Sequence, residues 1–126
     1  MRLPIPLLQR IIGKPVAQFE GSGHKRAVGR VSLRVRATVY PLHGDLLEDP
    51  LAVNLNDIST ETIGYTAYRA FMPFSSMVIT LPINAEGGAK SVQLRCRVMR
   101  CTRISDGRFR VAAMFLSIWQ VRVLAM

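Results

Sequence analysis

The chain has 126 residues, of which 49% are hydrophobic and 20% charged, and its formal net charge is +9. That length corresponds to one domain, and the hydrophobic fraction excludes a disordered chain. Most of the positive charge is arginine, whose planar fork of donors matches phosphate and stacks on flat rings. The composition therefore favours an anionic partner, and it leaves nucleic acid, a membrane surface, a nucleotide and a plain solvated surface open.

The cysteines and the apolar N-terminus indicate in which cellular compartment the protein is expected. Cys96 and Cys101 are five positions apart and would face opposite sides of one strand, so we expect no disulfide and a reducing, cytoplasmic environment. Cys96 shares parity with Leu94 and Val98, which indicates a core residue. No apolar run approaches the roughly 20 residues that span a bilayer, and the proline-broken start does not resemble a secretory signal. We therefore expect no transmembrane segment.

Residues 1–24 differ in character from residues 25–126, which we predict to be the folded domain. Three prolines and a Gly-Ser-Gly sequence interrupt the first segment, so it is predicted to be flexible. Residues 7–12 nevertheless have the pattern of a short amphipathic helical turn that ends at Gly13. We expect this turn to dock on its own domain, with a partner protein and a membrane surface as alternatives.

From Arg30 onwards the hydrophobic pattern changes to a period of two, which is typical of half-buried strands. The expected strands cover residues 31–39, 51–56, 63–68, 77–81, 92–98 and 109–115. Polar turns separate them, including a hairpin turn at Ser105-Asp106-Gly107. Six short antiparallel strands indicate an all-β sandwich or closed barrel. The tail from Ser117 is predicted to be a short C-terminal helix capped by that serine.

Arginines occupy outward positions around three of the expected strands. They are Arg30, Arg34, Arg36, Arg95, Arg97, Arg108 and Arg110. If these strands are neighbours in the sheet, one outer wall of the domain is strongly positive.

The sequence contains no pattern typical of an enzyme. His24 and His43 lack the spacing of metal ligands, and the eight acidic residues are scattered rather than paired. Neither a nucleophile elbow nor a phosphate-cradling or dinucleotide-binding glycine motif is present. We expect a protein with no catalytic residues and no metal site.

Two segments, Lys25–Arg30 and Asp57–Gly64, together resemble the PilZ domain family. The sequence from Lys25 to Arg30, directly before the first expected strand, is similar to that family's Arg-x-x-x-Arg motif. The sequence from Asp57 to Gly64 is similar to its Asp/Asn-x-Ser-x-x-Gly turn between the second and third strands. The order of the motifs and their placement on the strand pattern both fit, and the resemblance covers about residues 25–118. It implies a small six-stranded antiparallel β-barrel.

The resemblance also implies a ligand, the second messenger cyclic di-GMP, with a role for each motif residue. Arg26 and Arg30 would each pair with a phosphate or stack on a guanine. Asp57 would accept hydrogen bonds from the guanine N1–H and amine, and Ser59 would brace the turn or bond the ligand. In the family, a basic residue at the position of Lys25 accompanies binding of a stacked ligand pair.

One residue departs from the family pattern. Thr62 stands where the family has glycine, and a β-branched residue at positive φ would be strained by roughly 1–2 kcal/mol. We expect either a reshaped turn or flexibility supplied by Gly64, and the intact Asp57-Ile58-Ser59 favours retained binding. The candidate ligand-binding residues are therefore Lys25, Arg26, Arg30, Asp57, Ser59, Thr62 and Gly64.

The sequence thus predicts a cytoplasmic cyclic di-GMP receptor that passes the signal to a partner protein. The first alternative is a PilZ-like adaptor that binds no nucleotide and acts through protein contacts. The others are a basic single-strand nucleic-acid binder, for which few aromatic residues are present, and a membrane-surface role for residues 1–12. Arg30 and Arg34 also have the motif spacing, and the motif residues could instead be solvated charges and turn stabilisers.

Overall fold

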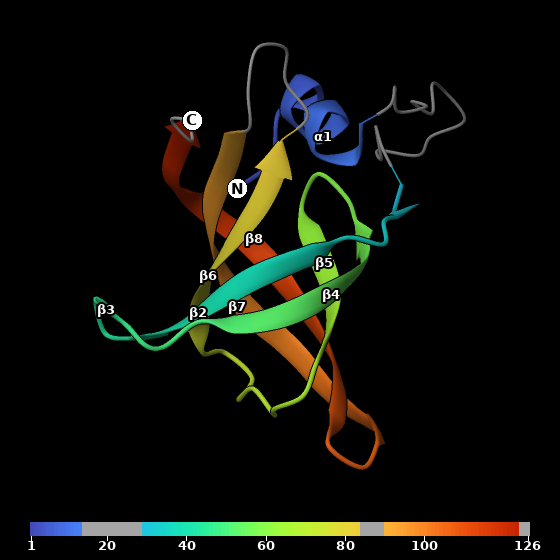
Figure 1. The fold of residues 1–126 in the computed structure, drawn as a ribbon, viewed down its shortest axis with the longest axis vertical. Helices are drawn as coiled ribbons and strands as arrows, with labels where there is room; N and C mark the ends of the chain where they lie inside the picture. The colour runs from blue at the N-terminus through green and yellow to red at the C-terminus, as the bar shows by residue number, and fades with distance from the viewer. Residues whose placement is uncertain (14–28, 84–89, 124–126) are drawn as a thin grey trace.

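The structure, a computed structural model, describes residues 1–13, 29–83 and 90–123. Six antiparallel strands close into a barrel in the order β4-β5-β8-β7-β6-β2, because β2 also pairs with β4 (Figure 1). The elements are α1 (Ile5–Ile12), β1 (Val31–Ser32), β2 (Arg36–His43), β3 (Leu46–Leu47), β4 (Leu51–Ile58), β5 (Thr62–Ala67), β6 (Ser76–Ile83), β7 (Lys90–Ser105) and β8 (Arg108–Val123). The prediction of a six-stranded antiparallel barrel is confirmed.

The first expected strand, residues 31–39, is divided into β1 and β2. Both pieces lie beside β4, and the irregular residues between them stay attached to it. The Leu33 amide donates to the Asn56 carbonyl at 3.1 Å, and the Leu55 amide donates to the Val35 carbonyl at 2.8 Å. The residues that follow Arg30 are therefore held along β4, with Ser32 opposite Asp57 of the second motif.

The barrel interior is filled by the inward-facing positions that the alternating pattern predicts. Val39, Leu94 and Phe115 are fully buried, and so is Cys96. Tyr65 packs edge-on against Phe71 with ring centroids 5.8 Å apart. This core sets the two faces of each strand, and so decides which side chains reach the outer wall.

Helix α1 covers one end of the barrel, beside the end of β6 (Figure 1). It begins after Pro4 and ends at Gly13, whose φ of 76° gives the left-handed C-terminal cap that glycine favours. Leu8 and Ile11 are buried in the barrel core, and the Leu3 amide donates to the Thr60 carbonyl at 2.7 Å. The expectation that this helical turn docks on its own domain is confirmed; the predicted boundary at residue 24 lies outside the described residues. No helix in the described ranges is long and apolar enough to cross a membrane.

The predicted C-terminal helix from Ser117 is wrong, because β8 continues as a strand to Val123. Residues of β8 beyond Ser117 pair with the first part of β7, with Leu94 opposite Ile118 and Gln93 opposite Gln120. β7 is long enough to offer backbone partners along this whole stretch, and the branched and aromatic residues of the tail suit a strand. The hairpin turn at Asp106-Gly107 was predicted correctly, with Gly107 at a φ of 70°.

We expect Tyr65→Phe to stabilise the barrel. The Tyr65 hydroxyl is buried and has no hydrogen-bond partner among the described residues. Burial raises its pKa, and the nearby Cys96 and Cys101 raise it further. An unfolded tyrosine ionises near about pH 10, so the folded state loses stability as pH rises past that value. The unfolding free energy of the variant, measured by urea denaturation, should be about 1 kcal/mol higher at pH 7. Above about pH 10 it should fall less steeply than that of the unaltered protein.

The exposed Tyr68 supplies the control. Tyr68→Phe should change neither the unfolding free energy at pH 7 nor its loss above about pH 10. A destabilised Tyr65→Phe variant at pH 7, or one with the same alkaline loss as the unaltered protein, would contradict this account of the core.

Candidate functional site

Asp57 lies on the outer wall because β4 contains a bulge. Leu55 pairs with Tyr65, but the next paired residue is Asp57, opposite Gly64, so Asn56 is an extra residue on this side. A bulge of this kind re-aims the side chain that follows it. Simple alternation from the inward Leu55 would point Asp57 into the core, whereas the bulge turns its carboxylate outwards, over β5.

Gly64 provides the space that this carboxylate occupies. A Cβ on Gly64 would lie 2.9 Å from Asp57 Oδ1 and 3.1 Å from Oδ2, closer than van der Waals contact allows. Gly64 lies within β5 and is not among the positive-φ glycines, so the alternative in which it supplies turn flexibility does not hold. Its role is the close approach that a glycine within a strand permits.

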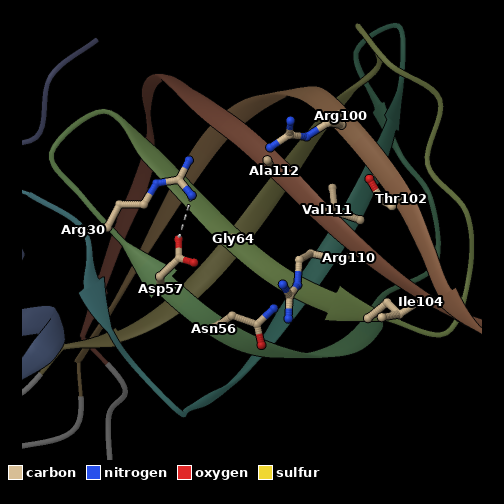
Figure 2. A pocket seen from close by; sticks show the side chains of 10 residues that line it. All are labelled: Arg30, Asn56, Asp57, Gly64, Arg100, Thr102, Ile104, Arg110, Val111 and Ala112. Carbon is tan, nitrogen blue, oxygen red and sulfur yellow. Dashed lines mark ion pairs between the residues drawn. The ribbon is translucent and has the colours of Figure 1, made fainter.

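A pocket of about 280 Å³ opens beside this carboxylate (Figure 2). Arg30 enters it from the segment before β1, with its Nη1 atom 4.0 Å from Asp57 Oδ1. That oxygen is buried, yet it accepts no hydrogen bond from the described residues. The carboxylate therefore has an acceptor atom without a donor, at the edge of an open cavity.

Two further arginines, from the opposite side of β5, line the same pocket (Figure 2). Arg100 pairs with Ala112 after a second bulge, at Met99, and Arg110 pairs with Thr66. Without that bulge Arg100 would share the inward parity of Val98. Three arginines and one carboxylate thus line the same pocket, and the excess positive charge favours an anionic ligand.

Ser59 braces the turn between β4 and β5. Its Oγ accepts hydrogen bonds from the Glu61 amide at 3.2 Å and the Thr62 amide at 3.0 Å, and it lies 2.9 Å from Thr62 Oγ1. Ser59 is buried and does not line the arginine pocket. Of the two roles that the sequence left open, the described contacts correspond to bracing.

Thr62 does not adopt the positive φ at which a β-branched residue would be strained. Thr62 begins β5 in an extended conformation, and among the described residues Phe74 is the one non-glycine with positive φ. The Thr62 side chain lies away from the arginine pocket, beside Met99 and Met114. Of the two alternatives that the sequence left open, the structure corresponds to a reshaped turn, which the Ser59 amide closes by donating to the Thr62 carbonyl at 2.9 Å.

The structure brings three of the seven predicted site residues together: Arg30, Asp57 and Gly64. Ser59 and Thr62 support the turn from outside the pocket, and Lys25 and Arg26 lie outside the described residues. Arg100, Arg110 and Asn56 are pocket residues that the motif did not include. The outward parity of Arg110 and Asn56 was a usable signal, whereas the bulge that turns Arg100 outwards has no sequence signature.

Comparisons with protein-family models, with curated proteins and with solved structures found no match to this chain. The interpretation of the site therefore rests on its geometry and on the motif residues themselves.

We expect Thr62→Gly, which introduces the glycine of the PilZ motif, to destabilise the protein. Glycine costs roughly 0.5–1 kcal/mol in a strand, and the variant also loses the hydrogen bond to Ser59 Oγ, worth about 1 kcal/mol. The free energy of unfolding, measured by urea denaturation, should fall by about 1–2 kcal/mol. Thr62→Val, which removes the hydroxyl alone, should lose about half as much. A gain in stability for Thr62→Gly would show that Thr62 is strained after all.

Proposed function

We propose that this protein is a cyclic di-GMP receptor of the PilZ type, a non-enzymatic cytoplasmic effector that passes the level of the second messenger to a partner protein. The observation that carries the proposal is the Asp57 carboxylate, whose buried Oδ1 has no hydrogen-bond donor among the described residues, in a pocket that three arginines line. This combination favours a ligand that brings negative charge and N–H donors together. Cyclic di-GMP has both, in its two phosphates and its guanine edges.

Each pocket residue has a distinct role in the proposed complex. Asp57 accepts hydrogen bonds from the guanine N1–H and amine, which form a two-donor edge that a carboxylate matches. Arg30 is 54% exposed and releases its 4.0 Å ion pair with Asp57 at small cost, because exposed ion pairs contribute about 0–1 kcal/mol. Its guanidinium then pairs with a phosphate or stacks on a guanine. Arg100 and Arg110 add positive charge on the opposite side of the pocket.

Lys25 and Arg26 are included in the proposed site on sequence grounds. Arg26 precedes Arg30 by four residues, and a fully extended chain of that length spans at most about 14 Å. Arg26 is therefore tethered within reach of a ligand that Arg30 contacts. Binding would draw this segment onto the ligand and so change the surface offered to a partner.

Isothermal titration calorimetry with cyclic di-GMP tests this proposal. The unaltered protein should bind saturably, and the stoichiometry should distinguish one ligand from a stacked pair. Arg26→Ala/Arg30→Ala should weaken binding at least about a hundredfold, because each charged hydrogen bond is worth roughly 1.5–3 kcal/mol. Arg69→Ala/Arg103→Ala removes the same charge from outside the pocket and should bind normally. Absence of heat at high ligand concentration would rule out the receptor role.

Gly64→Ala separates the site from the stability of the fold. The new Cβ would lie 2.9 Å from Asp57 Oδ1, and the carboxylate must move because it is the free end of its side chain. The free energy of unfolding should change by less than about 1 kcal/mol, since a small side-chain shift relieves the clash. The affinity for cyclic di-GMP should fall at least about tenfold, because the acceptor atoms leave their position. Unchanged affinity in a folded variant would remove Asp57 from the proposed site.

The second candidate is a PilZ-like adaptor that binds no nucleotide, and the β5–β6 loop favours it. Tyr68, Met72 and Phe74 in this loop are 67%, 78% and 73% exposed. Two backbone hydrogen bonds anchor the loop to Val98. The Phe74 amide donates to the Val98 carbonyl at 2.7 Å, and the Val98 amide donates to the Ser75 carbonyl at 2.8 Å. Apolar side chains held exposed on an ordered loop are a feature of protein-binding surfaces. A calorimetric titration without heat would make this the leading function.

A further inference from the structure

A second cationic depression adjoins the proposed cyclic di-GMP pocket, further along the outer wall. The strand register explains its shape, because Arg36, Asn54, Thr66 and Arg110 lie in one row across β2, β4, β5 and β8. The outer row thus has arginine at both ends and smaller polar residues between them. Three strand spacings of about 4.8 Å separate the two arginine backbones by about 14 Å. The row therefore forms a trough with a positive charge on each side.

The trough has a volume of about 530 Å³, and four arginines line it. Arg34 and Arg36 come from the β1–β2 side, and Arg108 and Arg110 from β8. Ser32, Asn54, Asn56 and Thr66 contribute hydroxyl and amide groups, and the described lining contains no acidic side chain. The Asn56 amide donates to Thr66 Oγ1 at 2.9 Å, which fixes the polar floor. Such a site combines uncompensated positive charge with groups that both donate and accept hydrogen bonds.

We propose that this trough binds the sugar-phosphate backbone of a single-stranded nucleic acid without sequence preference. Arginines on both sides match a polyanion that runs between them, and guanidinium planes also stack on unpaired bases. The amide and hydroxyl floor fits a ligand with both donors and acceptors, such as base edges and the 2′-hydroxyl. The ionised side chains of an acidic protein segment offer acceptors alone, so that partner fits the floor less well.

All four trough cations are arginine, in a chain with fourteen arginines and three lysines. A general need for solubility does not require this bias, whereas bidentate contact with phosphate does. The trough shares Arg110 and Asn56 with the proposed cyclic di-GMP pocket, but it does not include Asp57. Nucleic-acid binding is therefore a separate property, which survives if the receptor proposal fails.

Fluorescence anisotropy with a labelled 12-nucleotide single-stranded oligouridylate tests the inference. With four phosphate contacts, the logarithm of the binding constant should fall against the logarithm of salt with a slope of about −2.8. Arg36→Gln/Arg108→Gln, one arginine from each side, should weaken binding at least about tenfold and reduce the slope by about 1.4. Arg69→Gln/Arg103→Gln has the same net charge outside the trough and should bind like the unaltered protein.

Asp57→Ala separates the two proposals, because it should lose cyclic di-GMP and keep the oligonucleotide. If Arg36→Gln/Arg108→Gln and Arg69→Gln/Arg103→Gln weaken oligonucleotide binding equally, the effect is one of net charge, and the trough is not the binding site. Competition by an oligoglutamate peptide at the same concentration as unlabelled oligouridylate would reassign it to acidic protein segments. Equally tight binding of a duplex, or no binding at low salt, would also overturn it.

Discussion

The close approach of Asp57 to Gly64 is the constraint on which the outer wall of this barrel depends. The carboxylate lies over β5 at a distance that no side chain on Gly64 would allow. The bulge at Asn56 aims it there, and the closed barrel beneath holds both strands in register. A charged group is thus fixed on the wall with one oxygen buried, and no described residue donates a hydrogen bond to that oxygen. A ligand that supplies that donor gains a hydrogen bond and displaces only the weak, exposed ion pair between Asp57 and Arg30.

The positions of the arginines relative to β5 and Asp57 decide which ligands the outer wall favours. β5 presents small outward residues, Thr62, Gly64 and Thr66. Arginines lie on both sides of it, from β1, β2 and the residues next to them on one side and from β7 and β8 on the other. The result is a low polar floor between positive flanks, interrupted at one point by the Asp57 carboxylate. Where the carboxylate lies, the wall favours a ligand with phosphates and N–H donors. Where it is absent, the wall favours a plain polyanion. One sheet surface therefore supports both proposals, and a single acidic residue distinguishes them.

The sequence predicts the barrel well because alternation depends only on which side of a strand meets the core. It places Val39, Leu94 and Phe115 inside and finds the hairpin turn at Asp106-Gly107. It fails where one residue is added to a strand, since the bulges that reorient Asp57 and Arg100 leave no pattern in the residues around them. It also fails beyond Ser117, where pairing with β7 overrides a weak helical spacing. The motif located Arg30 and Asp57 by analogy, but Arg110 becomes a neighbour only through the strand order.

The most direct test of the account is a titration of ¹⁵N-labelled protein with cyclic di-GMP, followed by amide chemical shifts. Ligand seated over β5 should move the amides of Gly64, Asp57 and Ala112 most, because they form the floor of the arginine pocket. The amides of the β5–β6 loop should stay in place. Shifts centred on that loop, or none at saturating ligand, would contradict the claim that the Asp57–Gly64 approach organises a ligand site.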